Sequence, residues 1–351
     1  MSEMIPALDW QAIFVAPWTT DFSIYGWIFL MGFLVCAACG LAGNYLILRR
    51  MALVGDAISH SVLPGLAIAF LAANAWTNRQ AAGEGIDLAV EPSGHGISYG
   101  FSIFMGALIA GVLTTLIIEI IHTRTRIKQD AAIGITFSTL FAFGVVLISV
   151  YADKVDLDAD CVLHGEIAFV SIQPFFTIGT YQLAPSPVIR MGLVAFLTLG
   201  LMVVFYKELL VSSFDPGLAS SMGINATFVH YALMCWLSVI VVSAFEAVGA
   251  ILVIAMLILP GATASMLTSR FPIVLMLSLL HAAASSVLGL HLAIWLNSST
   301  AGCMVVAGAG IFCVAWVFSP SQGMLPNWLK RRRNSKRLPS GEIGTETVGE
   351  S

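Results

Sequence analysis

The sequence RRMALVGDAISHSVLPG occupies residues 49–65 and joins two long apolar segments. Arg49 and Arg50 end the first segment, and the second carries Asp56 and His60 close to its start. Ionisable residues are costly inside a membrane and mark functional sites there. Because residues four apart share one face of a helix, we expect the carboxylate and the imidazole to point at the same object.

The composition indicates a polytopic membrane protein. Of the 351 residues, 58% are hydrophobic and only 10% are charged, whereas soluble domains carry about 25% charged residues. The sequence predicts an all-α membrane protein, a polytopic bundle of 8–9 transmembrane helices, because some of its apolar runs can be broken or re-entrant. The runs fall at 24–48, 53–74, 99–121, 131–152, 187–206, 226–245, 247–267, 273–296 and 300–318.

Lysine and arginine set the predicted orientation, since cytoplasmic loops carry an excess of both. With the turn at residues 49–50 placed inside, thirteen of the sixteen Lys and Arg fall on the cytoplasmic side. We therefore expect the N-terminus outside and the C-terminus in the cytoplasm of a cell (inner or plasma) membrane. The predicted divisions are an extracytoplasmic segment 1–23, a permease domain 24–319, and a basic, disordered cytoplasmic tail 320–351.

Asp56 and His60 form the first candidate site. A carboxylate oxygen and an imidazole nitrogen suit manganese, iron or zinc ions. Two ligands are too few for a closed structural site, but they suit an ion in transit. The alternative is a buried Asp–His hydrogen bond that only holds helices together. Pro64 and Gly65 follow one turn later, where we expect a bend.

The second candidate lies in the cytoplasmic segment 207–225. Asp215 and Pro216 are typical of an N-cap followed by proline at the first helical position, and Gly223 is typical of a helix end. The sequence therefore predicts a helix of about two turns. Phe214, Leu218 and Met222 (i, i+4, i+8) predict an apolar stripe that faces the membrane surface or another protein.

Several other ionisable residues receive weaker predictions. The histidines of the later spans are expected to pack between helices more often than to bind an ion. Glu246 is expected at an outer turn, and Glu119 in a charge pair at the membrane interface with nearby His122 and Arg124. The outer segment 161–186 is expected to form a short helix or re-entrant turn. The remaining histidines and acids are His95, His164 and Glu166, which could touch a docking partner or ion, and His230, His281 and His291 in the spans.

Five long stretches of the chain follow, in order, the pattern of a known family. They are RRMALVGDAISHSVLPGLAIAFL (49–71), RIKQDAAIGITFSTLFAFGVVL (126–147), SSFDPGLASSMGI (212–224), VGAILVIAMLILPGATA (248–264) and FSPSQG (318–323). Through these stretches the chain, over about 24–323, resembles the permeases of ABC-type manganese, zinc and iron importers, the ABC-3 family. The stretch DLDADCVLHGEIAFV (156–170) looks like the Tro-type branch.

The resemblance implies a function, partners and sites. Such a permease works as a homodimer or beside a second permease, and it receives its ion from an extracytoplasmic metal-binding protein. It meets a cytoplasmic ABC ATPase dimer through a coupling helix, which 214–224 resembles. The family's metal pair matches Asp56 and His60. The divalent ion is cargo, no cofactor is bound permanently, and ATP hydrolysis belongs to the partner, since no Walker A stretch occurs here.

Two other functions stay open at this point. A secondary transporter could use Asp56 and His60 as a proton relay, and an ABC permease could carry a metal chelate or a vitamin instead of an ion. The capped cytoplasmic helix opposes the first alternative, and the ligand pair opposes the second. The pair is expected on the inner half of the transport route or near the midplane, because it lies only one to two turns beyond the arginines.

Overall fold

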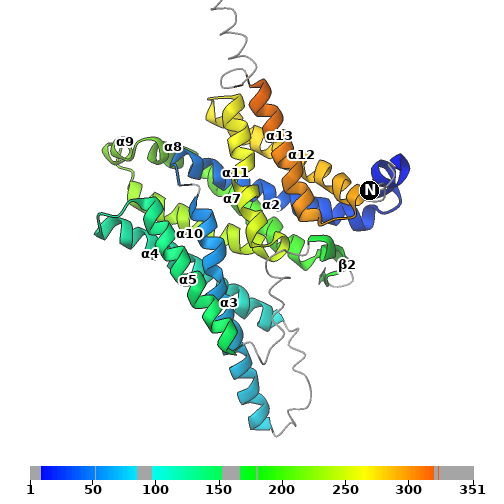
Figure 1. Cartoon of the computed structure of the whole chain (residues 1–351), viewed down its shortest axis with the longest axis horizontal. Helices are drawn as coiled ribbons and strands as arrows, with labels where there is room; N and C mark the ends of the chain where they lie inside the picture. The colour runs from blue at the N-terminus through cyan, green and yellow to red at the C-terminus, as the bar shows by residue number, and fades with distance from the viewer. Residues whose placement is uncertain are drawn as a thin grey trace, which may run out of the picture.

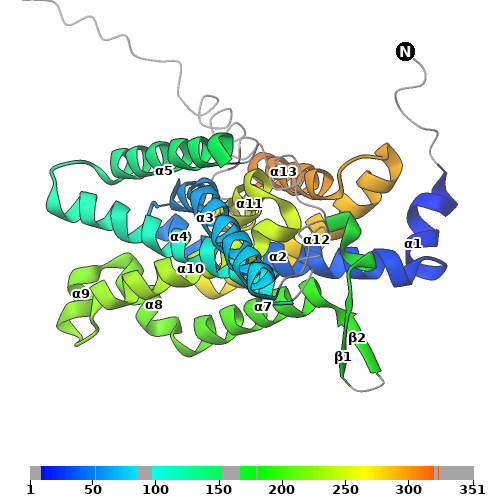
Figure 2. The ribbon, with the colours of Figure 1, turned by 90° about the horizontal axis from the view of Figure 1, so that it is seen from below.

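A computed structural model describes residues 9–51, 53–84, 97–151, 167–178, 181–319 and 323, and the chain forms a bundle of long helices (Figure 1). Helix α9 and the turn between α4 and α5 lie at one end, while the N-terminal helices and a β-hairpin lie at the other (Figures 1 and 2). His95, His164, Glu166 and nearly all of the tail 320–351 lie outside the described residues.

The described elements follow the predicted apolar runs closely. Helix α13 has the predicted bounds, and the other long helices begin or end within a few residues of theirs, α3 excepted. The elements are η1 (Gln11–Val15), α1 (Ala16–Thr19), α2 (Phe22–Leu48), α3 (Leu53–Glu84), α4 (Ile97–Arg124), α5 (Gln129–Tyr151), η3 (Ile167–Ile172), β1 (Phe175–Ile178), β2 (Tyr181–Pro185), α7 (Ser186–Val204), α8 (Tyr206–Phe214), α9 (Pro216–Ser221), α10 (Ala226–Val248), α11 (Ala250–Leu267), α12 (Phe271–Leu296) and α13 (Thr300–Phe318).

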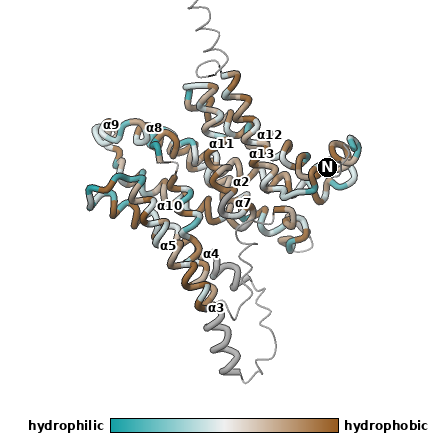
Figure 3. The backbone as a smooth tube through the Cα atoms, in the orientation of Figure 1, coloured by the Kyte–Doolittle hydropathy of each residue, from teal (hydrophilic) through white to brown (hydrophobic). Residues whose placement is uncertain are grey.

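Eight helices in the described part of the chain are long and apolar enough to cross a membrane, namely α2, α3, α4, α5, α7, α10, α12 and α13. The remaining predicted run, 247–267, forms α11 (Ala250–Leu267), whose apolar part, Leu252–Leu267, is shorter. Hydrophobic residues line the spans, and hydrophilic ones gather at α9 and at the neighbouring ends of α4 and α5 (Figure 3). The predicted all-helical membrane fold is therefore confirmed.

Helix α3 is longer than predicted. The predicted apolar run ended at residue 74, but the helix continues to Glu84. The added turns contain several alanines and a glutamine, which favour helix without needing an apolar face. Hydropathy located the membrane part of this helix and missed its polar extension.

The segment 161–186 was expected to form a short helix or re-entrant turn, and only part of it is helical. Residues Ile167–Ile172 form the 3₁₀ helix η3, whose Ile167 and Val170 are buried. A two-stranded antiparallel hairpin, β1–β2, then protrudes from the bundle (Figure 2). This hairpin was not predicted, although its phenylalanine, threonine, isoleucine and tyrosine residues favour strands.

Helix α2 lies at the centre of the bundle. Its residues from Val35 to Leu46 are all buried, and it packs against α7, α11 and α12. The contact with α11 is so close that a Cβ on Gly43 would overlap the carbonyl oxygen of Leu257, as small residues allow in membrane bundles. Buried Asn44 donates from its side-chain amide to the Ser278 hydroxyl of α12 over 3.0 Å.

Candidate metal site and coupling segment

The turn between α2 and α3 ends one helix sharply and starts the next. Arg50 has a left-handed backbone, with φ of 58°. The Arg50 N–H donates to Ile47 O over 3.0 Å and the Met51 N–H donates to Leu46 O over 2.9 Å, the paired bonds of a Schellman helix end. Helix α3 then begins at Leu53. The predicted turn at the two arginines is confirmed.

Asp56 and His60 share one face of the first turns of α3, as predicted. His60 Nε2 lies 3.4 Å from Asp56 Oδ1, and the two side chains are 21% and 39% exposed, respectively. The His60 ring packs against Phe137 and Phe141 of α5, with ring centroids 5.2 and 5.8 Å away. The aromatic rings restrict the imidazole on one side, while the carboxylate stays open to an ion.

The pair is a mixed donor set of one carboxylate and one imidazole, which suits a divalent transition-metal ion. Within the described residues, no group of three or more His, Cys, Asp or Glu is placed to hold a metal. Asp56 lies in the first turn of α3, where the helix dipole stabilises a negative charge. Among the described residues, this pair therefore offers two possible ligands, and an ion held there would have to complete its coordination with water or with other groups.

The predicted coupling segment is helical, but it is divided differently. Helix α9 covers only Pro216–Ser221, and Phe214 is the last residue of a separate helix, α8, which was not predicted. The backbone of Asp215 is extended, and this breaks the helix between them. The predicted i, i+4, i+8 stripe is therefore not one helical face, because its first residue precedes the break.

The predicted caps of this segment are confirmed. The Asp215 carboxylate accepts from the N–H groups of Gly217 and Leu218 over 2.9 and 3.1 Å, and Pro216 opens the helix. Gly223 has φ of 82°, the left-handed conformation of a helix end. The three apolar side chains are all exposed: Phe214 by 66%, Leu218 by 52% and Met222 by 60%.

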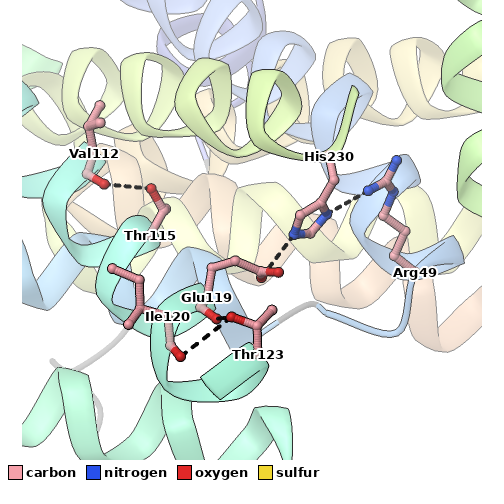
Figure 4. A network of polar contacts seen from close by, with 7 residues as sticks. All are labelled: Arg49, Val112, Thr115, Glu119, Ile120, Thr123 and His230. Carbon is pink, nitrogen blue, oxygen red and sulfur yellow. Dashed lines mark hydrogen bonds and ion pairs between the residues drawn. The ribbon is translucent and has the colours of Figure 1, made fainter. Parts of the chain in front are cut away.

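A polar network that the sequence did not predict lies beside the α2–α3 turn (Figure 4). Arg49 Nη1 lies 2.6 Å from His230 Nδ1, and His230 Nε2 lies 3.2 Å from Glu119 Oε2. The expected pairing of Glu119 with His122 and Arg124 is therefore replaced by one with His230 of α10. The sequence held a signal for this pairing, since Glu119 lies about one turn before the end of α4 and His230 about one turn after the start of α10.

The other ionisable residues of the spans lie apart from the candidate site. His281 is a buried residue of α12, only 5% exposed. His291 bridges the N-terminal helices: its Nε2 accepts from Trp18 Nε1 over 3.3 Å and its Nδ1 donates to Ile13 O over 3.0 Å. Glu246 lies in the last turn of α10. Both histidines thus lie in packing positions, as predicted.

The chain is similar to known transport proteins along most of its length. Residues 21–319 match the model of the ABC 3 transport family. The manganese transport system membrane protein MntD of Bacillus subtilis is 38% identical over 88% of this chain and 96% of its own length. The zinc transport system membrane protein TroD of Treponema pallidum is 36% identical over 87% and 77%, respectively.

A solved structure agrees with these sequence relatives. PsaBC from Streptococcus pneumoniae in complex with Fab contains a chain that is 32% identical to this one, with a TM-score of 0.67. The match covers 90% of this chain and 97% of that chain. The family match over residues 21–319 includes both the α2–α3 turn and the segment around α9.

Proposed function

Since this chain belongs to the ABC 3 transport family and is the membrane permease of an ABC importer for manganese, zinc or iron, we propose that Asp56 and His60 bind the ion during its passage. The observation that carries this proposal is their 3.4 Å approach on a half-exposed face of a membrane helix. The ion is cargo, and the chain holds no permanent cofactor. As a permease subunit, the chain has no ATPase activity of its own.

Family membership also decides between the alternatives left by the sequence. An ABC import system uses ATP, so the proton-coupled secondary transporter is excluded. A permease for a chelate or a vitamin needs a wide route and no metal ligands. The two relatives are named as membrane proteins of a manganese and of a zinc transport system. We propose a bare divalent ion as the cargo here.

We propose that α9 and the exposed residues beside it dock into a cytoplasmic ABC ATPase dimer. The exposure of Phe214, Leu218 and Met222 at one end of the bundle supports this. The basic residues Arg124 and Lys128, at the α4–α5 turn, lie at the same end, which supports a cytoplasmic location for α9 and an outer one for the N-terminus.

The opposite end and the outer helices suit the two remaining partners. An extracytoplasmic metal-binding protein would dock near the N-terminal helices and the β-hairpin, which lie at the end of the bundle opposite α9 (Figure 2). A second permease, identical or related, would complete the ion's coordination. Helix α5 packs next to His60 and exposes Ile135, Val146 and Val150, so a partner on this side would enclose the pair.

Transport then follows an alternating-access scheme. The ion leaves the binding protein, enters between the paired permeases and is held by Asp56 and His60. ATP-driven closure of the ATPase dimer moves α9, and this opens the route toward the cytoplasm. Two protein ligands hold the ion weakly enough to release it, as a transport site requires.

The test compares Asp56→Asn and His60→Ala with Asp130→Asn, an exposed acid in the first turn of α5. The proteins are assembled with the ATPase and binding protein in vesicles, and ATP-dependent manganese and zinc uptake is measured. Loss of a direct ligand should reduce uptake by more than about tenfold, the minimum reported for groups that only orient metal ligands. Unchanged uptake in both site variants, with the complex intact, would refute the metal-site proposal.

A further inference from the structure

One guanidinium group joins the turn before α3 to both flanks of α9. Arg49 Nε donates to the Ser213 hydroxyl and Nη2 to the Ser212 hydroxyl, each over 3.0 Å. The third contact, from Nη1, reaches His230 Nδ1 at 2.6 Å (Figure 4). The serines lie in the last turn of α8, just before α9, and His230 lies in the first turns of α10, just after it.

The chemistry of these groups fixes the direction of each hydrogen bond. A guanidinium can only donate, so His230 Nδ1 must accept from Arg49. The proton of the neutral ring is then on Nε2, which donates to Glu119 Oε2 over 3.2 Å. A positive Arg49, a neutral His230 and a negative Glu119 therefore form one directed chain of contacts from α2 through α10 to α4.

The network is shielded from solvent. His230 and Glu119 side chains are 18% and 15% exposed, and Ser212 and Ser213 are buried at 3% and 8%. Burial lowers the pKa of the Arg49 guanidinium, which nevertheless stays charged in proteins. In such surroundings a hydrogen bond to a charged group is strong, and leaving one partner unpaired is costly.

The position of Arg49 allows these contacts to link movements of α8 and α10 to the α2–α3 turn. Arg49 is followed directly by left-handed Arg50, and Asp56 lies only seven residues beyond Arg49. Any displacement of α9 must move α8 or α10, and both are bonded to Arg49. The small cavity beside the network, lined by Met51, Val54, Glu119 and His230 among others, does not suit a second cation, because the Arg49 charge is adjacent.

We propose that Arg49, His230 and Glu119 are positioning residues that transmit movement of α9 to the α2–α3 turn and so to Asp56 and His60. This inference rests on the proposed function, in which α9 docks on the ATPase. It assigns the three residues a role in coupling ATP hydrolysis to transport, not in binding the ion.

The experiment measures metal uptake and ATP hydrolysis in parallel on the whole complex in proteoliposomes, with manganese as the ion. His230→Leu and the double variant Ser212→Ala/Ser213→Ala break different parts of the network. His230→Gln retains one acceptor and one donor, as the neutral imidazole has. The matched controls are His122→Leu and Ser265→Ala, since both residues are exposed and each hydrogen-bonds, within the described part of the chain, to a nearby backbone carbonyl.

We expect the number of ions moved per ATP hydrolysed to fall about tenfold in His230→Leu and in the double serine variant, the change that one lost charged hydrogen bond produces. The hydrolysis rate and the recovery of complex should be unchanged, His230→Gln should restore most of the ratio, and the controls should match the native protein. If His230→Leu fails to assemble, the serine variant decides, because it leaves the His230–Glu119 bond intact.

Two results distinguish a failure of the coupling inference from a failure of the proposed function. If uptake and hydrolysis fall together and the ratio stays native, the network is only a structural clamp and the inference is wrong. If the native complex itself shows no ATP-dependent uptake, the proposed function fails, whatever the variants do.

Discussion

Gly144 of α5 lies against Pro64 of α3, one turn beyond His60. A Cβ at Gly144 would come within 2.9 Å of both the Cδ and the backbone nitrogen of the proline. The two helices therefore meet at this point with no room for a side chain, and α5 brings Phe137 and Phe141 against the His60 ring. The position of the His60 ring between α3 and α5 depends on this close approach.

Replacing Gly144 by alanine should push α5 away from α3. Because the contact involves backbone and a rigid ring, we expect a loss of about 1–3 kcal/mol of stability, measured as a lower thermal midpoint in detergent. Gly134→Ala on the same helix is the control, since, apart from its own stretch of helix, no atom of the described residues lies within 4 Å of its Cβ position. Equal melting of the two variants would contradict the tight contact.

Replacing Phe137 by alanine should free the His60 ring to turn away from Asp56. Ring contacts of this kind contribute about 0.5–1.5 kcal/mol, so we expect the KM for manganese uptake to rise by about 2–10-fold with the maximal rate little changed. Phe143→Ala on the same helix is the comparison, because Phe143 is 50% exposed. A similar KM in both variants would show that Phe137 does not orient the His60 imidazole.

Removing the Asp215 cap should loosen α9. Asp215→Ala leaves the N–H groups of Gly217 and Leu218 without their acceptor, at a cost of about 1 kcal/mol. The ATPase should then co-purify less well with the permease, while Asp215→Asn, which can still cap, should behave as native. Full recovery of the ATPase with Asp215→Ala and with Phe214→Ala would argue against α9 as the docking element.

Replacing His291 by alanine should release the N-terminal helices from α12. The change removes two hydrogen bonds, to Trp18 and to the Ile13 carbonyl, each worth about 1 kcal/mol. Amides of Gln11–Thr19 should exchange with deuterium faster, whereas those of α12 should keep their protection. His122→Ala, at an exposed site on α4, should leave exchange in this segment unchanged.

The membrane fold could be predicted from the sequence because hydropathy and the positions of basic residues depend on local composition. The turn at Arg49 and Arg50, the cap at Asp215 and the stop at Gly223 were also predictable, since each depends on a few adjacent residues. The β-hairpin and the extension of α3 to Glu84 were not, because neither depends on burial in an apolar medium.

The candidate site was predictable only in part. The shared face of Asp56 and His60 follows from helical periodicity. The partner of Glu119 does not, because His230 lies 111 residues away along the chain and only tertiary packing brings the two together. Likewise, the aromatic residues beside His60 come from a different helix, and nothing in the spacing of α3 indicates them.

The hydrogen bond between Asn44 and Ser278 has a consequence for how the protein is made. The two residues are 234 positions apart, so α2 leaves the ribosome and enters the bilayer long before α12 is synthesised. During that interval Asn44 has no Ser278 to bond, whereas its bond to the Gly40 carbonyl lies within α2 and needs no other helix. Helix α2 forms the centre of the finished bundle, yet α7, α11 and α12, which pack against it, are all synthesised later. Its packing is therefore completed late in biogenesis.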